Sequence, residues 1–474
     1  MVKINLLCCY FVHGLDGCNK DFKNIHEKTK EIFNSLFKNG NENENENENG
    51  SEDEIKNYFY GYRSNDNALL KTHAQFQTII DKSFNELQRF MEDIALTNFQ
   101  KDNEEKYNHF ENIECNLYFS IIGHSLGGLI SRSVVKYIYS GFKKDDFEYA
   151  TYFEYLKKKF PFITTIKPCT FLTLSTPHLG SLACNENGSI VKRTEKNMVR
   201  FYCNYFSGSI GKVFTYNDGN KDVKPTLIRL SQKGYMDIYE KFPNRTLIGC
   251  VRYDIPVKFC SAIASLDHPV FEYEKENLLI DKSKSDTRIC SYSGYEGKEL
   301  DYYQKEIFNE KVSENMYYKD TKNVPPPNID EQIKIGLEKI NSKKKDNKDN
   351  DENQTPLKYE EMEDVFIPDT INQVESAVSV LKLFNKVSFR RIIIDFSLPN
   401  VAKLATHAIY MGNVITPGNI PVINSMVAKT VKLFSDIIIA DYLLTSEQNN
   451  KYSLNDIITK NENNENAESN KNNE

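Results

Sequence analysis

The amino-acid sequence predicts an α/β protein with a mostly parallel central sheet flanked by helices. Two observations support this fold class. Apolar runs of strand length alternate along the chain with segments whose apolar residues recur at helical spacing. The intervening turns are rich in glycine, and three polar segments interrupt the pattern without adding to it. Strands that alternate with helices form βαβ units, in which helices cover both faces of the sheet.

The elements follow from these two patterns. Strands are predicted over 5–12, 56–62, 115–122, 170–174, 246–251 and 391–396. Helices are predicted over 25–37 and 72–93, directly after Ser125, and over 429–444. For the last of these, we favour a helix that covers the sheet over one that lies on a membrane surface.

Three polar segments are predicted to decorate this core. The first, 39–54, reads "NGNENENENENGSEDE" and is a loop insertion; 275–364 is a largely polar, partly disordered insertion; 447–474 is a disordered tail. The predicted core is therefore divided into an N-terminal part, 1–274, and a C-terminal part, 365–446.

Charge and composition exclude some classes of partner. The chain has 474 residues and a formal net charge of −7, which argues against nucleic acid and anionic lipid as partners. The ten cysteines form no CxxC pair and no zinc spacing, so we expect reduced, buried thiols in an intracellular, cytoplasmic protein. The N-terminal run "MVKINLLCCYFVHGLDG" lacks a small-residue cleavage site, and no stretch of 18 apolar residues predicts a transmembrane helix.

The segment Gly123-His124-Ser125-Leu126-Gly127 has the G-x-S-x-G pattern of a nucleophile elbow. A predicted strand precedes it and a predicted helix follows, which is the context that the motif requires. The strained turn exposes the serine hydroxyl, and the Leu126 amide at the helix N-terminus is placed to stabilise an oxyanion. A glycine-rich turn without chemistry is the alternative.

The first strand ends in "FVHGLDG", a His13-Gly14 turn. In serine hydrolases such a turn supplies the second oxyanion donor, here the Leu15 amide. His13 is then a structural residue of the turn and not a base.

Three stretches, "FVHGLDG", "IIGHSLGGLISR" and "FLTLSTPHLGS", resemble in order the motifs of the DUF676 serine esterase and lipase family of α/β-hydrolases. Similar stretches are "RSNDNALLKTHAQF", "RTLIGCVRYDIPVKFCSAIAS" and, more loosely, "FRRIIIDFSLPNVAKLATHAIYMGN". The resemblance implies an α/β-hydrolase fold and a Ser-Asp-His triad without metal or organic cofactor. Because the family includes yeast lipid-droplet and monoacylglycerol lipases, it also implies a lipid ester substrate.

The base is predicted to be His407, because the triad of this fold runs serine, acid, histidine along the chain. Five of the eight histidines precede Ser125. His178 directly follows a strand and is interpreted as a packed residue, and His268 is too close in sequence to the predicted acid. His407 follows the last predicted strand, although "LATHAIY" matches the family motif for the base only in part.

The acid is predicted to be Asp254, with Asp267 and Asp237 as alternatives. Asp254 ends the strand-like run "TLIGCVRYD" and precedes a small apolar stretch, which is where the family carries its aspartate. This carboxylate would fix the histidine tautomer and stabilise the imidazolium.

The segment 182–224 separates two predicted strands at a place where this fold often inserts a cap. Aromatic residues stand at Phe201, Tyr202, Tyr205, Phe206, Phe214 and Tyr216. They form either the face of a mobile lid over an acyl pocket or a surface packed onto the domain.

These inferences predict an esterase or lipase acting on glycerolipid or lysophospholipid acyl esters, with peripheral contact to a membrane or lipid droplet. An acyltransferase or thioesterase would use the same acyl-enzyme. A degenerate hydrolase acting as a scaffold is the alternative outside the enzymes.

Overall fold

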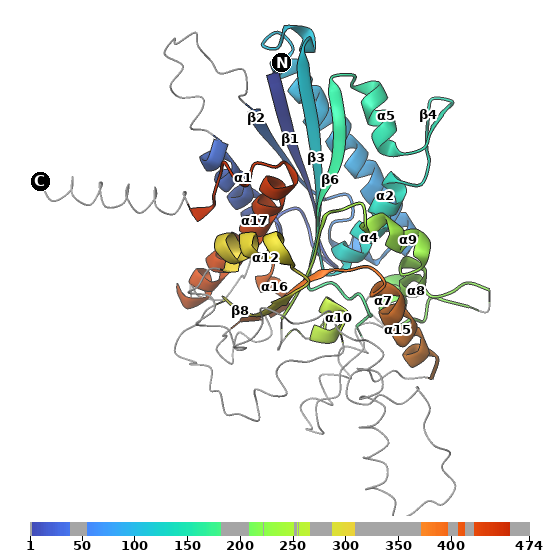
Figure 1. The fold of residues 1–474 in the computed structure, drawn as a ribbon. Coiled ribbons are helices and arrows are strands. Elements are labelled where there is room, and N and C mark those ends of the chain that lie inside the picture. Colours follow the sequence, from blue (N-terminus) through green and yellow to red (C-terminus); the bar gives the residue numbers. More distant parts are fainter. Residues whose placement is uncertain are drawn as a thin grey trace, which may run out of the picture.

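A computed structural model of the chain describes residues 2–37, 55–181, 208–220, 222–250, 254, 256–265, 287–308, 371–396, 406–412 and 421–455. Through their centre runs a seven-stranded sheet in the order β2-β1-β3-β6-β7-β9-β8 (Figure 1). Its strands are β1 (Val2–Val12), β2 (Ile55–Arg63), β3 (Ile113–His124), β6 (Ile163–Leu174), β7 (Asn244–Cys250), β8 (Thr287–Ser293) and β9 (Arg390–Phe396). All neighbours are parallel except β8, which pairs antiparallel with β9. The predicted α/β fold with a mostly parallel sheet is confirmed.

Strand β1 shows why the central strands are continuous apolar runs. Ile4, Leu6, Cys8, Tyr10 and Val12 join the hydrophobic cluster on one face of the sheet. Their neighbours Leu7, Cys9 and Phe11 join the cluster on the other face. Since both faces are covered, the strand is continuously apolar from Leu6 to Val12.

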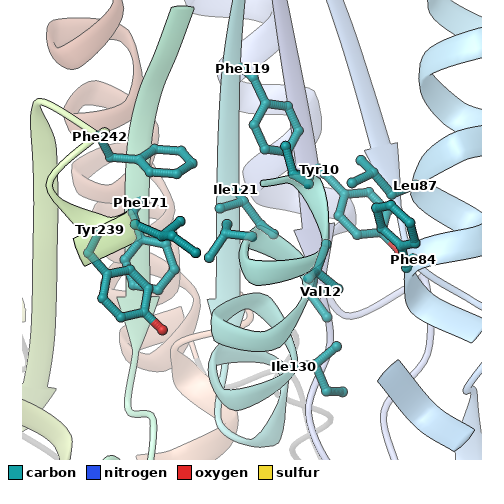
Figure 2. Packing of buried hydrophobic residues seen from close by; sticks show 14 of the residues in the cluster. Tyr10, Val12, Phe84, Leu87, Phe119, Ile121, Ile130, Phe171, Tyr239 and Phe242 are labelled. Carbon is teal, nitrogen blue, oxygen red and sulfur yellow. The ribbon is translucent and has the colours of Figure 1, made fainter. Parts of the chain in front are cut away.

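The first face is covered chiefly by α2 (Phe76–Arg89), α4 (Leu126–Ile138), α5 (Tyr152–Lys159), α9 (Lys233–Tyr239) and α15 (Ile371–Phe384). Figure 2 shows part of this cluster: Tyr10 of β1 faces Phe84 and Leu87 of α2, and Phe171 of β6 lies beside Tyr239 of α9. The shorter elements on or around this face are η2 (Leu69–His73), η3 (Phe90–Leu96), α3 (Thr97–Asn103), η4 (Asn108–Phe110), the hairpin β4 (Phe142–Lys144) and β5 (Phe147–Tyr149), α7 (Gly208–Phe214), α8 (Thr226–Leu230) and α10 (Phe259–Ile263).

The second face is covered by α1 (Lys23–Phe37), α12 (Gly297–Tyr303) with η6 (Gln304–Phe308), and α17 (Pro421–Thr445), which lie together beside the sheet in Figure 1. Val431, Phe434 and Ile437 of α17 are buried against this face. The last predicted helix therefore covers the sheet, as favoured above. Of the described helices, none is both long and apolar enough to cross a bilayer.

Of the predicted insertion 275–364, the structure describes residues 287–308. Within this segment, β8 is an edge strand of the central sheet, and Tyr292, Tyr303 and Phe308 are buried. Arg390 of β9 donates one hydrogen bond to the Tyr303 hydroxyl of this segment and another to Asp441 of α17. The segment is thereby attached to the core. The buried tyrosines explain why this ordered part, which packs on the core, looks polar in composition.

Two further boundaries differ from the prediction. The predicted tail 447–474 begins too early: Leu454 is buried, and its amide donates to Glu306 Oε2 at 2.7 Å. The predicted helix 72–93 is divided among η2, α2 and the π-helical η3. The break between η2 and α2 lies at Ala74, whose backbone is extended, with φ −64° and ψ 175°. The loop 39–54 lies outside the described residues.

Of the segment 182–224, the structure describes 208–220 and 222–224. Phe214 and Tyr216 are buried there, and the Tyr216 hydroxyl donates to the Leu179 carbonyl at 3.0 Å. These two aromatics therefore pack onto the domain. The other four lie outside the described residues.

The parallel strands end at one edge of the sheet. Gly123 of β3 lies in register with Val12 of β1, and His124 lies in register with Leu174 of β6. The carboxyl ends of β1, β3, β6, β7 and β9 therefore lie at this edge, where parallel α/β sheets carry their sites.

Candidate active site

Ser125 lies in a strained turn between β3 and α4. Its φ of 53° and ψ of −125° lie in a region that non-glycine residues rarely adopt. The Ser125 amide donates to the Leu174 carbonyl at 3.0 Å, and its carbonyl accepts from the Gly128 amide at 3.0 Å. The elbow predicted from G-x-S-x-G is therefore present and held from both sides.

The glycines of the elbow are required by close contacts. A Cβ on Gly127 would lie 2.0 Å from the Val12 carbonyl oxygen, and one on Gly128 would lie 1.9 Å from Thr176 Oγ1. A Cβ on Gly123 would lie 2.6 Å from the Gly128 Cα. These glycines allow α4 to start directly against the ends of β1 and β6.

The His13-Gly14 turn lies against the elbow. A Cβ on Gly14 would be 2.9 Å from the Ser125 Cβ, so the turn that carries Leu15 touches the serine. In the hydrogen bonds of the described turns and loops, neither the Leu15 nor the Leu126 amide is a donor. Both amides are therefore available to a ligand beside Ser125.

His13 has a structural position, as the sequence predicted. Its ring is buried, and Nδ1 donates to the Gly14 carbonyl at 3.0 Å. Burial lowers the pKa of His13, which favours the neutral ring. The ring thus shapes the turn that carries Leu15.

Asp254 and His407 meet at the same edge, although 153 residues separate them. His407 Nδ1 donates to Asp254 Oδ1 at 2.9 Å, and Asp254 is 3% exposed. His407 lies on α16 (Thr406–Ile409), after β9. A carboxylate bonded to Nδ1 fixes the tautomer whose Nε2 can accept a proton.

His124 links the base to the elbow. Its Nε2 donates to the backbone carbonyl of His407 at 3.1 Å, and the two ring centroids lie 4.6 Å apart. Burial, aided by the nearby His407, holds the pKa of His124 well below its usual range, so the ring is a neutral donor. The hydrogen bonds among described residues include none between Ser125 Oγ and His407. Such catalytic bonds often tighten only when substrate binds.

Ser175 is a site residue that the sequence reasoning missed. Its hydroxyl donates to Asp254 Oδ2 and lies 3.3 Å from His407 Nδ1. The available signal was its place in "FLTLSTPHLGS", directly after the strand that adjoins the elbow. The same turn supplies Thr176, which fills the space beside Gly128.

The alternatives for base and acid differ in their surroundings. His178 is fully buried, its Nε2 lies 3.0 Å from Thr173 Oγ1, and burial holds its pKa well below the usual range. Asp237 is exposed on α9. Asp267 and His268 lie outside the described residues.

The described residues contain no group of three or more His, Cys, Asp or Glu side chains that could hold a metal ion. The side chains of seven cysteines are described, all of them free, and six of these are buried. Only Cys18 among these seven is partly exposed, near the His13-Gly14 turn.

Comparison with curated proteins and with solved structures gives no match. A family model described as "Putative serine esterase (DUF676)" matches residues 5–266, which is more than half of the 474 residues. The matched residues include Ser125, Ser175 and Asp254, whereas His407 lies beyond them. The chain therefore belongs to the DUF676 family of serine esterases.

Proposed function

We propose that the protein is a serine esterase or lipase that hydrolyses carboxylic esters through Ser125, His407 and Asp254. The observation that carries this proposal is the 2.9 Å hydrogen bond between His407 Nδ1 and Asp254 Oδ1 at the edge where the Ser125 elbow lies. His124 connects the two parts by donating to the His407 carbonyl from the position next to Ser125.

In the first step, His407 Nε2 takes the proton of the Ser125 hydroxyl, and Oγ attacks the ester carbonyl. The tetrahedral intermediate then collapses, and the leaving alkoxide receives the proton from His407. In the second step, His407 takes a proton from water, which attacks the acyl-enzyme carbonyl. The bond to Ser125 Oγ then breaks, Oγ receives the proton from His407, and the carboxylic acid leaves. Asp254 stabilises the imidazolium in both steps.

The Leu15 and Leu126 amides would stabilise the oxyanion of both intermediates. Two observations support this role. The Gly14 backbone approaches Ser125 so closely that an added Cβ would lie 2.9 Å from the serine Cβ. Leu126 is the first residue of α4, where the helix dipole favours negative charge.

We infer that the substrate is a glycerolipid or lysophospholipid acyl ester presented at a neutral lipid surface. The resemblance to lipid-hydrolysing relatives supports the substrate class. Leu69 and Leu70 support the surface, because they are 59% and 80% exposed on η2. The Leu69 amide donates to the Gly17 carbonyl at 2.8 Å, so this apolar pair lies next to the His13-Gly14 turn.

Release of fatty acid from monoacylglycerol and from lysophosphatidylcholine tests the proposal. Wild type should release fatty acid from at least one, and Ser125→Ala should release none. Transfer of the acyl group to an added alcohol or thiol in preference to water would instead indicate an acyltransferase. Folded wild type that hydrolyses neither these lipids nor a short p-nitrophenyl ester would contradict the proposal and favour a scaffold.

A further inference from the structure

Ser175 connects the predicted acid to the end of β6. Its side chain is fully buried, and its hydroxyl donates to Asp254 Oδ2. The other carboxylate oxygen, Oδ1, accepts from His407 Nδ1 at 2.9 Å and from the Val257 amide at 3.3 Å. The two oxygens of Asp254 thus have separate donors, and the donor to Oδ2 is Ser175.

The backbone around Ser175 is fixed by both neighbouring strands. The Ser175 amide donates to the Ile248 carbonyl of β7 at 2.9 Å. The carbonyl of Leu174, one residue earlier, accepts from the Ser125 amide at 3.0 Å. Two consecutive residues therefore hold the nucleophile on one side and the acid on the other. Ser175 has a φ of 45°, a strained value that this surrounding structure maintains.

We propose that Ser175 is a positioning residue, which holds Asp254 in the orientation that aligns Oδ1 with His407 Nδ1. The inference rests on the proposed esterase function and deepens it. A buried carboxylate oxygen without a donor is costly, so loss of the Ser175 hydroxyl favours rotation of Asp254 toward other donors. Such rotation would misalign the imidazole, as loss of a supporting hydrogen bond does at other sites that depend on an oriented histidine.

The test compares Ser175→Ala and Ser175→Gly with wild type, and repeats Ser175→Ala in an Asp254→Asn background. Glycine accepts the positive φ, so Ser175→Gly removes the hydroxyl even where alanine impairs folding. The measurements are the rate of labelling by a fluorophosphonate probe and kcat and KM for a short p-nitrophenyl ester. Ser133→Ala is the matched control, because Ser133 is a buried serine whose hydroxyl donates to the Leu129 carbonyl within α4.

We expect both Ser175 variants to lower kcat and the labelling rate roughly 10-fold, with KM changed less than about 2-fold. In the Asp254→Asn background the further loss should fall below about 2-fold, because residues that act as one unit are not additive. Ser133→Ala should match wild type.

Equal losses in the wild-type and Asp254→Asn backgrounds would show a merely structural role and overturn the inference. Wild-type rates in Ser175→Gly would overturn it as well. Failure of the esterase function is a separate outcome, since folded wild type would then neither react with the probe nor hydrolyse the ester.

Discussion

His124 donates from Nε2 to the backbone carbonyl of His407, 283 positions later in the chain, at 3.1 Å. The residue directly before the serine of the G-x-S-x-G motif therefore contacts the backbone of the predicted base on α16. This contact is the direct link between the elbow and α16.

His124→Phe should lower kcat roughly 3- to 10-fold, because it removes one hydrogen bond to the backbone that orients His407. His124→Gln keeps an N–H donor at a similar reach and should retain more of the activity. The rates of ester hydrolysis by the two variants show whether the hydrogen-bond donor at position 124 contributes to kcat. Equal rates for Phe and Gln would show that the donor is unimportant.

Asp254→Asn should lower kcat by roughly 10³- to 10⁴-fold with little change in KM, because the amide favours the wrong imidazole tautomer. Asp237→Asn serves as control, since Asp237 is exposed on α9. Steady-state kinetics on a short p-nitrophenyl ester give both parameters. A small decrease in kcat in Asp254→Asn would indicate that Asp267 is the acid instead.

The buried carboxyl group of Asp436 should make the free energy of unfolding depend on pH. Burial raises its pKa to about 6 from a usual value of 3.8, although Lys432 lies 2.5 Å away. A raised pKa in the folded state favours folding below pH 4, and this contribution is lost as the pH rises through 6.

Asp436→Asn should therefore gain stability relative to wild type as the pH rises from 4 to 7.5, by up to roughly 3 kcal/mol. Urea unfolding of both proteins at several pH values measures this difference. A difference that does not change with pH would contradict the assigned cause.

Leu69→Ser/Leu70→Ser should weaken binding to neutral phosphatidylcholine vesicles about 10-fold or more, because it removes two exposed leucines from the proposed contact. Hydrolysis of a soluble short-chain ester should remain unchanged. Phe147→Ser is the control, because Phe147 is 67% exposed but lies on the β4–β5 hairpin. Equal vesicle binding by all three proteins would exclude this contact surface.

Much of the fold was predictable because its signals are local. The six predicted strands correspond to β1, β2, β3, β6, β7 and β9. The central strands β1 and β3 are apolar runs buried along most of their length, whereas the edge strand β2 is partly buried throughout. Strand β8 was missed because its segment is rich in tyrosine and polar residues, and its pairing with β9 is nonlocal. A buried tyrosine that bonds Arg390 and Asp441 looks like a polar surface residue in sequence.

As with the fold, the parts of the candidate site that have a local sequence signal could be predicted. Ser125 has a motif, and the chain order of the triad points to residues after it. Ser175 has no pattern of its own, because its contact with Asp254 arises from the register between β6 and β7. His124 was visible in the motif, but its contact with the His407 backbone depends on where α16 lies.

The most direct test of the proposed esterase is labelling by a fluorophosphonate probe, which forms a covalent adduct with an activated serine. The comparison uses four proteins: wild type, Ser125→Ala, His407→Ala and the control His178→Asn. Circular dichroism should first show that each is folded. The proposed triad predicts labelling of wild type and His178→Asn, none of Ser125→Ala, and labelling of His407→Ala slowed by at least roughly 10³-fold. Undiminished labelling of Ser125→Ala, or no labelling of folded wild type, would contradict it.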